Sequence, residues 1–226
     1  LTVEVPDQNL GHVATHEMKD EIYDRIAELV KTHRTTLVFV NTRRFVERVS
    51  QALGERLGKE VVAAHHGSLS RHARFAAEQA LKNGPISVMV ATASLELGID
   101  VGHVDLVVHL GAARSIASLL QRVGRSGHTR FGKPKGVMFP LTRDDLMQCV
   151  AAVRSVFKGG LDRLTIPECP LDILAQQMVA IVASQELPTE ELWSCVRRAH
   201  PFRNLTRADF NAVLEMLSEG IATSRG

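Results

Sequence analysis

The segment Gln121–His128 combines residue types that are suited to phosphate chemistry. It reads Gln-Arg-Val-Gly-Arg-Ser-Gly-His, and a helix is predicted just before it, over residues 115–120. An arginine at such a helix end can reach across a cleft and neutralise charge on a transferring phosphoryl group. Its guanidinium stays charged and binds phosphate oxygens through two hydrogen bonds. Taken alone, the segment favours a solvated basic helix end, which is the commoner role of arginine-rich stretches.

A second polar segment, residues 90–100, leaves an apolar strand and enters a turn. Thr92 and Ser94 offer hydroxyls beside backbone N–H groups, and together these can hold one phosphate. Gly98 permits close approach of a ligand to the backbone, and Asp100 can accept a hydrogen bond from a ribose hydroxyl. The alternative is a plain strand–loop–strand connection with capping hydroxyls.

Two more polar segments, Asn41–Arg43 and His66–Ser68, follow apolar strands in the same way. Each offers small polar groups and a helix N-terminus, where a phosphate can bind. Each one alone is more often a simple helix cap. If the sheet is parallel, both segments lie at the same edge as Thr92, and together they predict a phosphate-binding track.

The elements that position these segments alternate along the first 140 residues or so. Short apolar strands are predicted at residues 1–5, 37–40, 61–64, 86–91, 104–110 and 135–141, with helices that begin after Thr42 and Ser70. Apolar strands separated by amphipathic helices indicate a parallel sheet that is covered on both faces. Right-handed crossovers make this a doubly wound α/β domain. Ligands bind at the carboxyl ends of such strands, where we also expect Arg125 to lie.

The pattern changes after Thr142. A helix is predicted over residues 142–158, which ends a first domain at 1–158, and a linker with Gly-Gly and two prolines follows at 159–170. Residues 171–226 contain three helix patterns: one at 171–184, one capped by Thr189 and one capped by Thr206. Three short helices of this kind suggest a small, mostly helical relative of the winged-helix fold, which we expect to be incomplete at its C-terminal end.

Composition narrows the classes of function. The net charge is +2, from 27 basic and 25 acidic residues, so any surface that binds nucleic acid must be local. Aromatic residues make up 4%, which argues against binding by base stacking alone. The three cysteines show no paired spacing, as in reduced cytoplasmic proteins, and the histidines show no metal-ligand spacing. No apolar run is long enough to cross a membrane.

Several segments carry a family resemblance. Residues 36–43, 64–71, 90–100 and 121–128 resemble motifs IV, IVa, V and VI of superfamily 2 helicases, in that order. Residues 119–130, 134–149 and 166–177 are similar to the large helicase-related (Lhr) family of ATP-dependent DNA helicases. The resemblance implies the second RecA-like motor domain of a longer cytoplasmic protein, with a role in DNA repair, followed by the start of a winged-helix domain.

The resemblance also implies roles for individual residues. Gln121 and Arg125 would approach the γ-phosphate of ATP, with Arg125 as the arginine finger, and Arg122 would pair with an acidic residue of the first motor domain. The residues implied to face the nucleotide are Gly98, Asp100, Gly124 and His128. Those implied to hold the backbone of single-stranded DNA are Asn41, Thr42, Arg43, His66, Gly67, Ser68 and Thr92. Two positions depart from the pattern: His128 replaces a second arginine, and Ala112–Ala113 replace Ser-Pro.

Two phosphate-chemistry motifs are absent from the 226 residues. There is no Gly-x-x-x-x-Gly-Lys-Ser/Thr loop and no Asp-Glu-x-x box. We therefore expect ATP and Mg²⁺ to be bound mainly by the first RecA-like domain of the same polypeptide, and this fragment alone to be inactive. The resemblance implies 3′→5′ movement on single-stranded DNA and action on DNA or RNA:DNA duplexes.

Two other functions remain open at this point. The helical tail could be a DNA-binding module on a non-enzymatic α/β scaffold, in which case Arg125 would be dispensable. The α/β domain could instead belong to an enzyme that uses a dinucleotide. The absence of Gly-x-Gly-x-x-Gly after the first strand disfavours this last alternative.

Overall fold

The computed structural model describes residues 1–96, 102–127 and 133–220. The chain divides into two compact units, Leu1–Asp162 and Arg163–Gly226, and the division falls inside the segment predicted as a linker. Three residues implied to face the nucleotide, Gly98, Asp100 and His128, lie outside the described residues.

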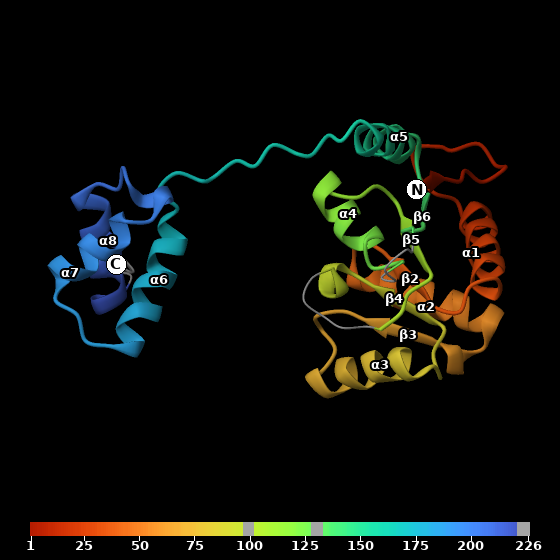
Figure 1. The fold of residues 1–226 in the computed structure, drawn as a ribbon, viewed down its shortest axis with the longest axis horizontal. Helices are drawn as coiled ribbons and strands as arrows, with labels where there is room; N and C mark the ends of the chain where they lie inside the picture. The colour runs from red at the N-terminus through yellow and green to blue at the C-terminus, as the bar shows by residue number, and fades with distance from the viewer. Residues whose placement is uncertain (97–101, 128–132, 221–226) are drawn as a thin grey trace, which may run out of the picture. The chain divides into compact units, whose positions relative to one another are not determined.

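The first unit is built on a six-stranded sheet in which every pair of neighbouring strands is parallel (Figure 1). The strands are β1 (Thr2–Val3), β2 (Thr36–Phe39), β3 (Val62–His65), β4 (Val88–Ala91), β5 (Leu106–Leu110) and β6 (Gly136–Phe139). Their order across the sheet is β1-β6-β5-β2-β4-β3. The predicted parallel sheet is confirmed, with strand bounds that differ from the predicted ones by a few residues.

Helices cover both faces of this sheet. They are α1 (His16–Lys31), α2 (Arg43–Leu57), α3 (Arg71–Asn83), α4 (Ile116–Val123) and α5 (Arg143–Phe157). Successive strand residues point to opposite faces, so Val38 packs with α1 and α2, while Leu37 and Phe39 belong to the core with α3, α4 and α5. The domain is therefore a doubly wound, RecA-like α/β fold, as predicted.

Hydroxyl caps fix where all five of these helices begin: Thr15, Thr42, Ser70, Ser115 and Thr142. The side chains of Thr42, Ser70 and Thr142 each accept a hydrogen bond from the backbone N–H three residues further on. Such a cap satisfies a donor that the first turn of a helix leaves unpaired. Because α2 and α3 start directly after the polar segments that end β2 and β3, the caps also hold these segments at the sheet edge.

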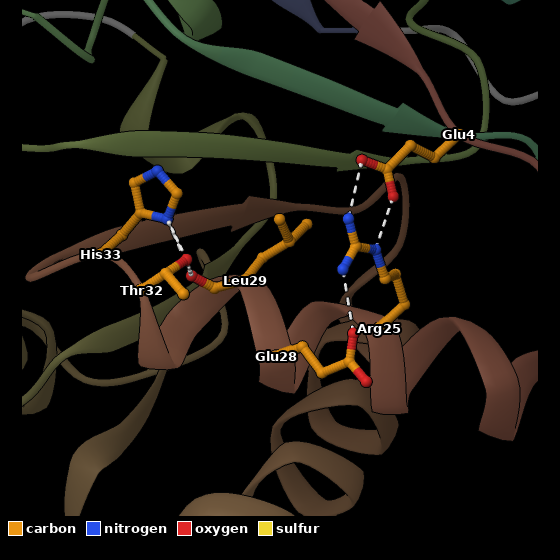
Figure 2. Close-up of polar contacts among 6 residues, drawn as sticks. All are labelled: Glu4, Arg25, Glu28, Leu29, Thr32 and His33. Carbon is orange, nitrogen blue, oxygen red and sulfur yellow. Dashed lines mark hydrogen bonds and ion pairs between the residues drawn. The ribbon is translucent and has the colours of Figure 1, made fainter.

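Helix α1 is absent from the elements predicted from the sequence. Thr15 caps it, and buried apolar residues recur on one face, from Met18 to Val30. Near its middle, Arg25 Nε lies 2.8 Å from a carboxylate oxygen of Glu4, just after β1 (Figure 2). That ion pair is exposed and contributes at most about 1 kcal/mol, so apolar burial is what holds α1 on the sheet. Past its end, His33 Nδ1 lies 2.8 Å from the carbonyl oxygen of Leu29.

The second unit contains α6 (Leu171–Ser184), α7 (Thr189–Arg197) and α8 (Arg207–Glu219) around a small core of its own. Thr206 caps α8, as predicted, but Thr189 is the first residue of α7 and Pro188 holds the cap position without a side-chain hydrogen bond. Proline has no N–H to leave unpaired, which makes it compatible with a helix start. Trp193 meets the Phe210 ring edge-on at 5.1 Å between centroids. No helix of the described part of the chain is long and apolar enough to span a membrane.

Candidate functional site

The three polar segments predicted to form a track follow strands that are neighbours in the sheet. Strand β4 lies between β2 and β3, and the last residues of all three are in register: Phe39 pairs with Ala91, and Ala91 with His65. Asn41, His66 and Thr92 therefore emerge at the same level of one sheet edge. The structure brings these segments together as the parallel pattern predicts.

A cleft of about 620 Å³ opens at this edge, beside the ends of β2 and β4. Its lining contains three arginines, a single carboxylate and no aromatic ring: Val40, Asn41, Thr42, Arg43, Thr92, Ala93, Glu96, Arg114, Ser118 and Arg122. Arg114 and Ser118 were not among the residues predicted from the sequence. Arg114 follows the end of β5, so the rule that places Asn41 at the carboxyl edge would have found it too.

Three of the predicted DNA-binding residues, Arg43, His66 and Ser68, form one hydrogen-bonded group. The Arg43 guanidinium donates to the hydroxyl of Ser68 (2.7 Å) and lies close to Gly67. His66 is buried, and its Nδ1 accepts from the Ser68 N–H (3.3 Å). Its Nε2 then carries the proton and lies 2.6 Å from a Glu47 carboxylate oxygen. Arg43 and Ser68 are exposed, whereas His66 supports the loop from behind.

Asn41 and Thr42 join neighbouring segments at the cleft. The Asn41 side-chain amide donates to the carbonyl oxygen of Ala112 (3.1 Å), which ties the end of β2 to the loop after β5. Ala112 belongs to the pair that departs from the family pattern, and here it offers only its backbone to this contact. Thr42 uses its hydroxyl to cap α2. Thr42 and Arg43, at the N-terminal end of α2, both line the cleft, and a helix N-terminus favours an anion.

Thr92 and Ser94 are supported by a buried histidine. The Thr92 hydroxyl lies 3.4 Å from that of Ser94, which lies 2.8 Å from Nδ1 of His65. His65 Nε2 is 2.9 Å from a Glu78 oxygen. Burial lowers the pKa of His65, since it disfavours the charged imidazole. The hydroxyls after β4 are thus fixed by a neutral histidine from β3, a contact that the sequence did not suggest.

Arg122 is buried at the back of the cleft. Its Nε lies 3.0 Å from a carboxylate oxygen of Glu96, its Nη1 lies 2.5 Å from Nε2 of His109, and its Cζ lies 5.2 Å from the centre of the Phe39 ring. Only 3% of Arg122 is exposed. The resemblance implied a partner on the first motor domain, whereas this structure supplies a carboxylate from the same unit.

His109 completes the environment of Arg122. Its Nδ1 lies 2.9 Å from the carbonyl oxygen of Gly111, which can only accept, so Nδ1 carries the proton and Nε2 accepts from Arg122. Burial, and then the charge of Arg122, lower the pKa of His109 to about 4. The imidazole is therefore neutral at pH 7. A histidine near the end of an apolar strand was the sequence signal that could have revealed this contact.

The backbone around Arg125 lies towards the amino ends of the strands rather than at the carboxyl edge, while its side chain reaches Glu96, which lines the cleft at that edge. Ser126 forms a parallel bridge with Val104, which precedes β5, and its hydroxyl bonds to Lys135, which precedes β6. The reason is the parallel topology: α4 must return to the amino ends of the strands before β6 can begin. The half-buried Arg125 side chain reaches back, and its Nη2 donates to the carbonyl oxygen of Glu96 (2.6 Å).

The remaining predicted residues of this segment lie on α4. Gln121 is exposed. Gly124 ends the helix, and a Cβ there would come within 2.9 Å of the Leu120 carbonyl oxygen, so close backbone packing favours glycine. Among residues 1–96, 102–127 and 133–220, no three His, Cys, Asp or Glu side chains are grouped so as to hold a metal ion.

Two family models match the chain, one inside the first unit and one that begins within α5 and extends over the second unit. Residues 18–130 match the family model of the helicase conserved C-terminal domain, and residues 154–226 match that of the winged-helix domain of large helicase-related proteins. The fold and the site therefore define the C-terminal RecA-like domain of a superfamily 2 helicase.

Relatives narrow the class to one family. The chain is 39% identical over 216 residues to the ATP-dependent helicase Lhr-Core of Methanocaldococcus jannaschii, covering 96% of this chain and 26% of that protein. It is 42% identical over 224 residues to the Lhr helicase/uracil glycosylase of Escherichia coli, covering 85% of this chain and 15% of that protein. The chain belongs to the large helicase-related (Lhr) family. It spans about a quarter of the length of the first of these relatives.

Solved structures agree with this assignment. The structure of Mycobacterium smegmatis helicase Lhr bound to single-stranded DNA and AMP-PNP matches with a TM-score of 0.84 and 39% identity, over 96% of this chain and 29% of that one. The C-terminal domain of the DEAD-box protein Dbp5 matches with a TM-score of 0.52 and 21% identity, over 70% of this chain and 83% of that one. This second likeness shows the shared fold alone.

Proposed function

We propose that the chain is the C-terminal motor half of an ATP-dependent DNA helicase, and that its cleft binds the backbone of single-stranded DNA. The observation that carries this proposal is the cleft at the carboxyl ends of β2 and β4, which is lined by three arginines and one carboxylate. The names of the relatives support it, as does the single-stranded DNA in the M. smegmatis Lhr structure.

The charges in the cleft favour phosphate over base recognition. Glu96 already offsets Arg122, so the exposed Arg43 and Arg114 carry the net positive charge. The lining offers hydroxyls and an amide from Asn41 but no aromatic ring on which a base could stack. Binding is therefore sensitive to salt and largely independent of sequence.

The nucleotide would meet a different part of the domain. Arg125 would act as the arginine finger on the γ-phosphate, with Gln121 close by, while Gly98, Asp100, Gly124 and His128 face the nucleotide. Mg²⁺ would be held by the first RecA-like domain of the same polypeptide, where it would neutralise charge on the phosphates.

Domain closure around ATP, followed by opening, would move the cleft along the strand. We extend the proposal to 3′→5′ movement, to DNA or RNA:DNA duplexes as substrates and to a role in cytoplasmic DNA repair. The 226-residue chain alone would neither hydrolyse ATP nor unwind DNA. DNA-dependent turnover by this chain that survives Arg125→Ala would refute that part.

The decisive experiment uses the full-length protein. Arg125→Ala should lower kcat for DNA-dependent ATP hydrolysis by about 10³-fold or more, the usual range for arginine fingers. Affinity for single-stranded DNA should stay within about twofold. Arg154→Ala, which removes an exposed arginine of α5, is the matched control. If both variants hydrolyse ATP like the wild type, the finger role is wrong.

A further inference from the structure

Glu96 contacts two arginines through two different groups. Its carboxylate pairs with Arg122, which lines the cleft (3.0 Å), and its backbone carbonyl accepts from Arg125 (2.6 Å). Glu96 lines the cleft as well. One residue therefore touches both the cleft proposed to bind DNA and the arginine proposed to meet ATP.

Two further contacts of Arg122 hold its guanidinium beside Glu96. Arg122 also bonds to His109 of β5 and lies over the ring of Phe39 of β2. The side chains of the pair are 4% and 15% exposed for Arg122 and Glu96, so solvent screens their attraction only in part. The position of Glu96, and of its carbonyl, is thus tied to the central strands of the sheet.

An anion in the cleft would weaken the contact between Arg122 and Glu96. A phosphate that binds beside Arg122 competes with the Glu96 carboxylate for the same guanidinium, and the two negative charges repel each other. Glu96 follows the short 3₁₀ turn η2 (Ala93–Leu95) and belongs to no helix or strand, so its position depends on the contact with Arg122, and loosening that contact would let its backbone shift. A shift of its carbonyl would move one hydrogen-bond acceptor of Arg125.

We propose that Glu96 is a positioning residue that couples occupancy of the cleft to the placement of Arg125. The inference rests on the proposed function, in which DNA phosphate occupies the cleft and Arg125 meets the triphosphate. It assigns Arg122 to this coupling through its contact with Glu96, in place of a contact with the first motor domain. A plain structural ion pair would instead affect folding alone.

The test is Glu96→Gln in the full-length protein, with Glu55→Gln as the matched control. Glutamine keeps the shape and the backbone carbonyl but removes the charge that competes with phosphate. Stimulation of kcat by single-stranded DNA should fall about tenfold, a usual size for coupling between two sites, while DNA affinity is kept or improved. Glu55 is exposed, and among the residues that the structure describes its side chain accepts a hydrogen bond from Gln51 on the same helix, so its variant should behave as the wild type.

A double-mutant cycle asks whether Glu96 acts through Arg125. In an Arg125→Lys background, Glu96→Gln should reduce DNA stimulation by less than about twofold further, because the target of the coupling is already altered. An equal loss in both backgrounds overturns the proposal. Glu96→Asp, which keeps the charge on a shorter stem, should give an intermediate loss and serves if Glu96→Gln folds poorly.

The outcomes separate this proposal from the function on which it rests. If Arg125→Lys lowers ATP turnover but Glu96→Gln leaves DNA stimulation intact, the coupling role is wrong and the motor function stands. If Arg125→Lys itself leaves ATP turnover unchanged, both proposals are overturned together. A drop in thermal stability of Glu96→Gln with unchanged DNA stimulation also overturns the coupling role.

Discussion

Replacing Arg122 by methionine tests the buried ion pair at the back of the cleft. The substitution keeps most of the apolar stem but leaves the Glu96 carboxylate and Nε2 of His109 without their donor. Removing one partner of a buried pair costs about 3–5 kcal/mol. Because 15% of the Glu96 side chain is exposed to water, we expect the lower end of that range, about 3 kcal/mol of unfolding free energy.

The assay is urea unfolding of the 226-residue chain, followed by circular dichroism, with the free energy taken from the midpoint and slope. Arg154→Met is the control and should stay within about 0.5 kcal/mol of the wild type, because this arginine is exposed. Adding Glu96→Gln to Arg122→Met should recover about 1 kcal/mol or more, since no charge is then buried alone. A loss below about 1 kcal/mol for Arg122→Met would refute the reasoning.

Two further predictions concern groups packed around α4. His109 has its pKa lowered to about 4 in the folded chain but titrates near its ordinary value of about 6.5 when unfolded. The unfolded state therefore binds more protons than the folded state between these two pH values. The contribution of His109 to the free energy of unfolding is complete above about pH 6.5 and is lost as the pH falls towards 4, and the loss is about 2 kcal/mol at pH 5. His109→Gln should flatten this part of the stability–pH curve, and an unchanged curve would contradict the assigned pKa. At Gly136, a Cβ would lie 2.8 Å from Cγ2 of Val123, so Gly136→Ala should destabilise the chain by about 1–3 kcal/mol. Part of that loss should return in Gly136→Ala/Val123→Ala, and a neutral Gly136→Ala would show that α4 is free to move away from β6.

Local patterns in the sequence were sufficient for most of the fold. Apolar strands without alternation specified a buried parallel sheet, and Thr42 and Ser70 marked helix starts that the structure confirms. Helix α1 was overlooked although its apolar residues recur at helical spacing. Many charged residues separate the apolar ones in that stretch, but an amphipathic helix needs only one apolar stripe. Thr189 was misplaced by one residue because proline serves equally well before a first turn.

Only those parts of the candidate site that depend on parallel strands and helix caps could be predicted from the sequence. Parallel strands bring their carboxyl ends to one edge, so Asn41, His66 and Thr92 could be placed together. The contact of Arg122 with Glu96 could not, because it joins residues 26 positions apart through the packing of α4 beside β5. The backbone of Arg125 was placed too near the carboxyl edge because the return of α4 to the amino ends of the strands was not taken into account.

The most direct test of the proposed function is whether the cleft binds single-stranded DNA. Affinity of the full-length protein for single-stranded DNA should be measured as a function of salt for the wild type, Arg43→Ala and Arg154→Ala. If Arg43 contacts one phosphate, Arg43→Ala should weaken binding and make the slope of log K against log salt less steep by about 0.7, the value for one contact on a single strand. Arg154→Ala should match the wild type. The same slope and affinity in all three proteins would contradict a DNA-binding cleft at the carboxyl ends of β2 and β4.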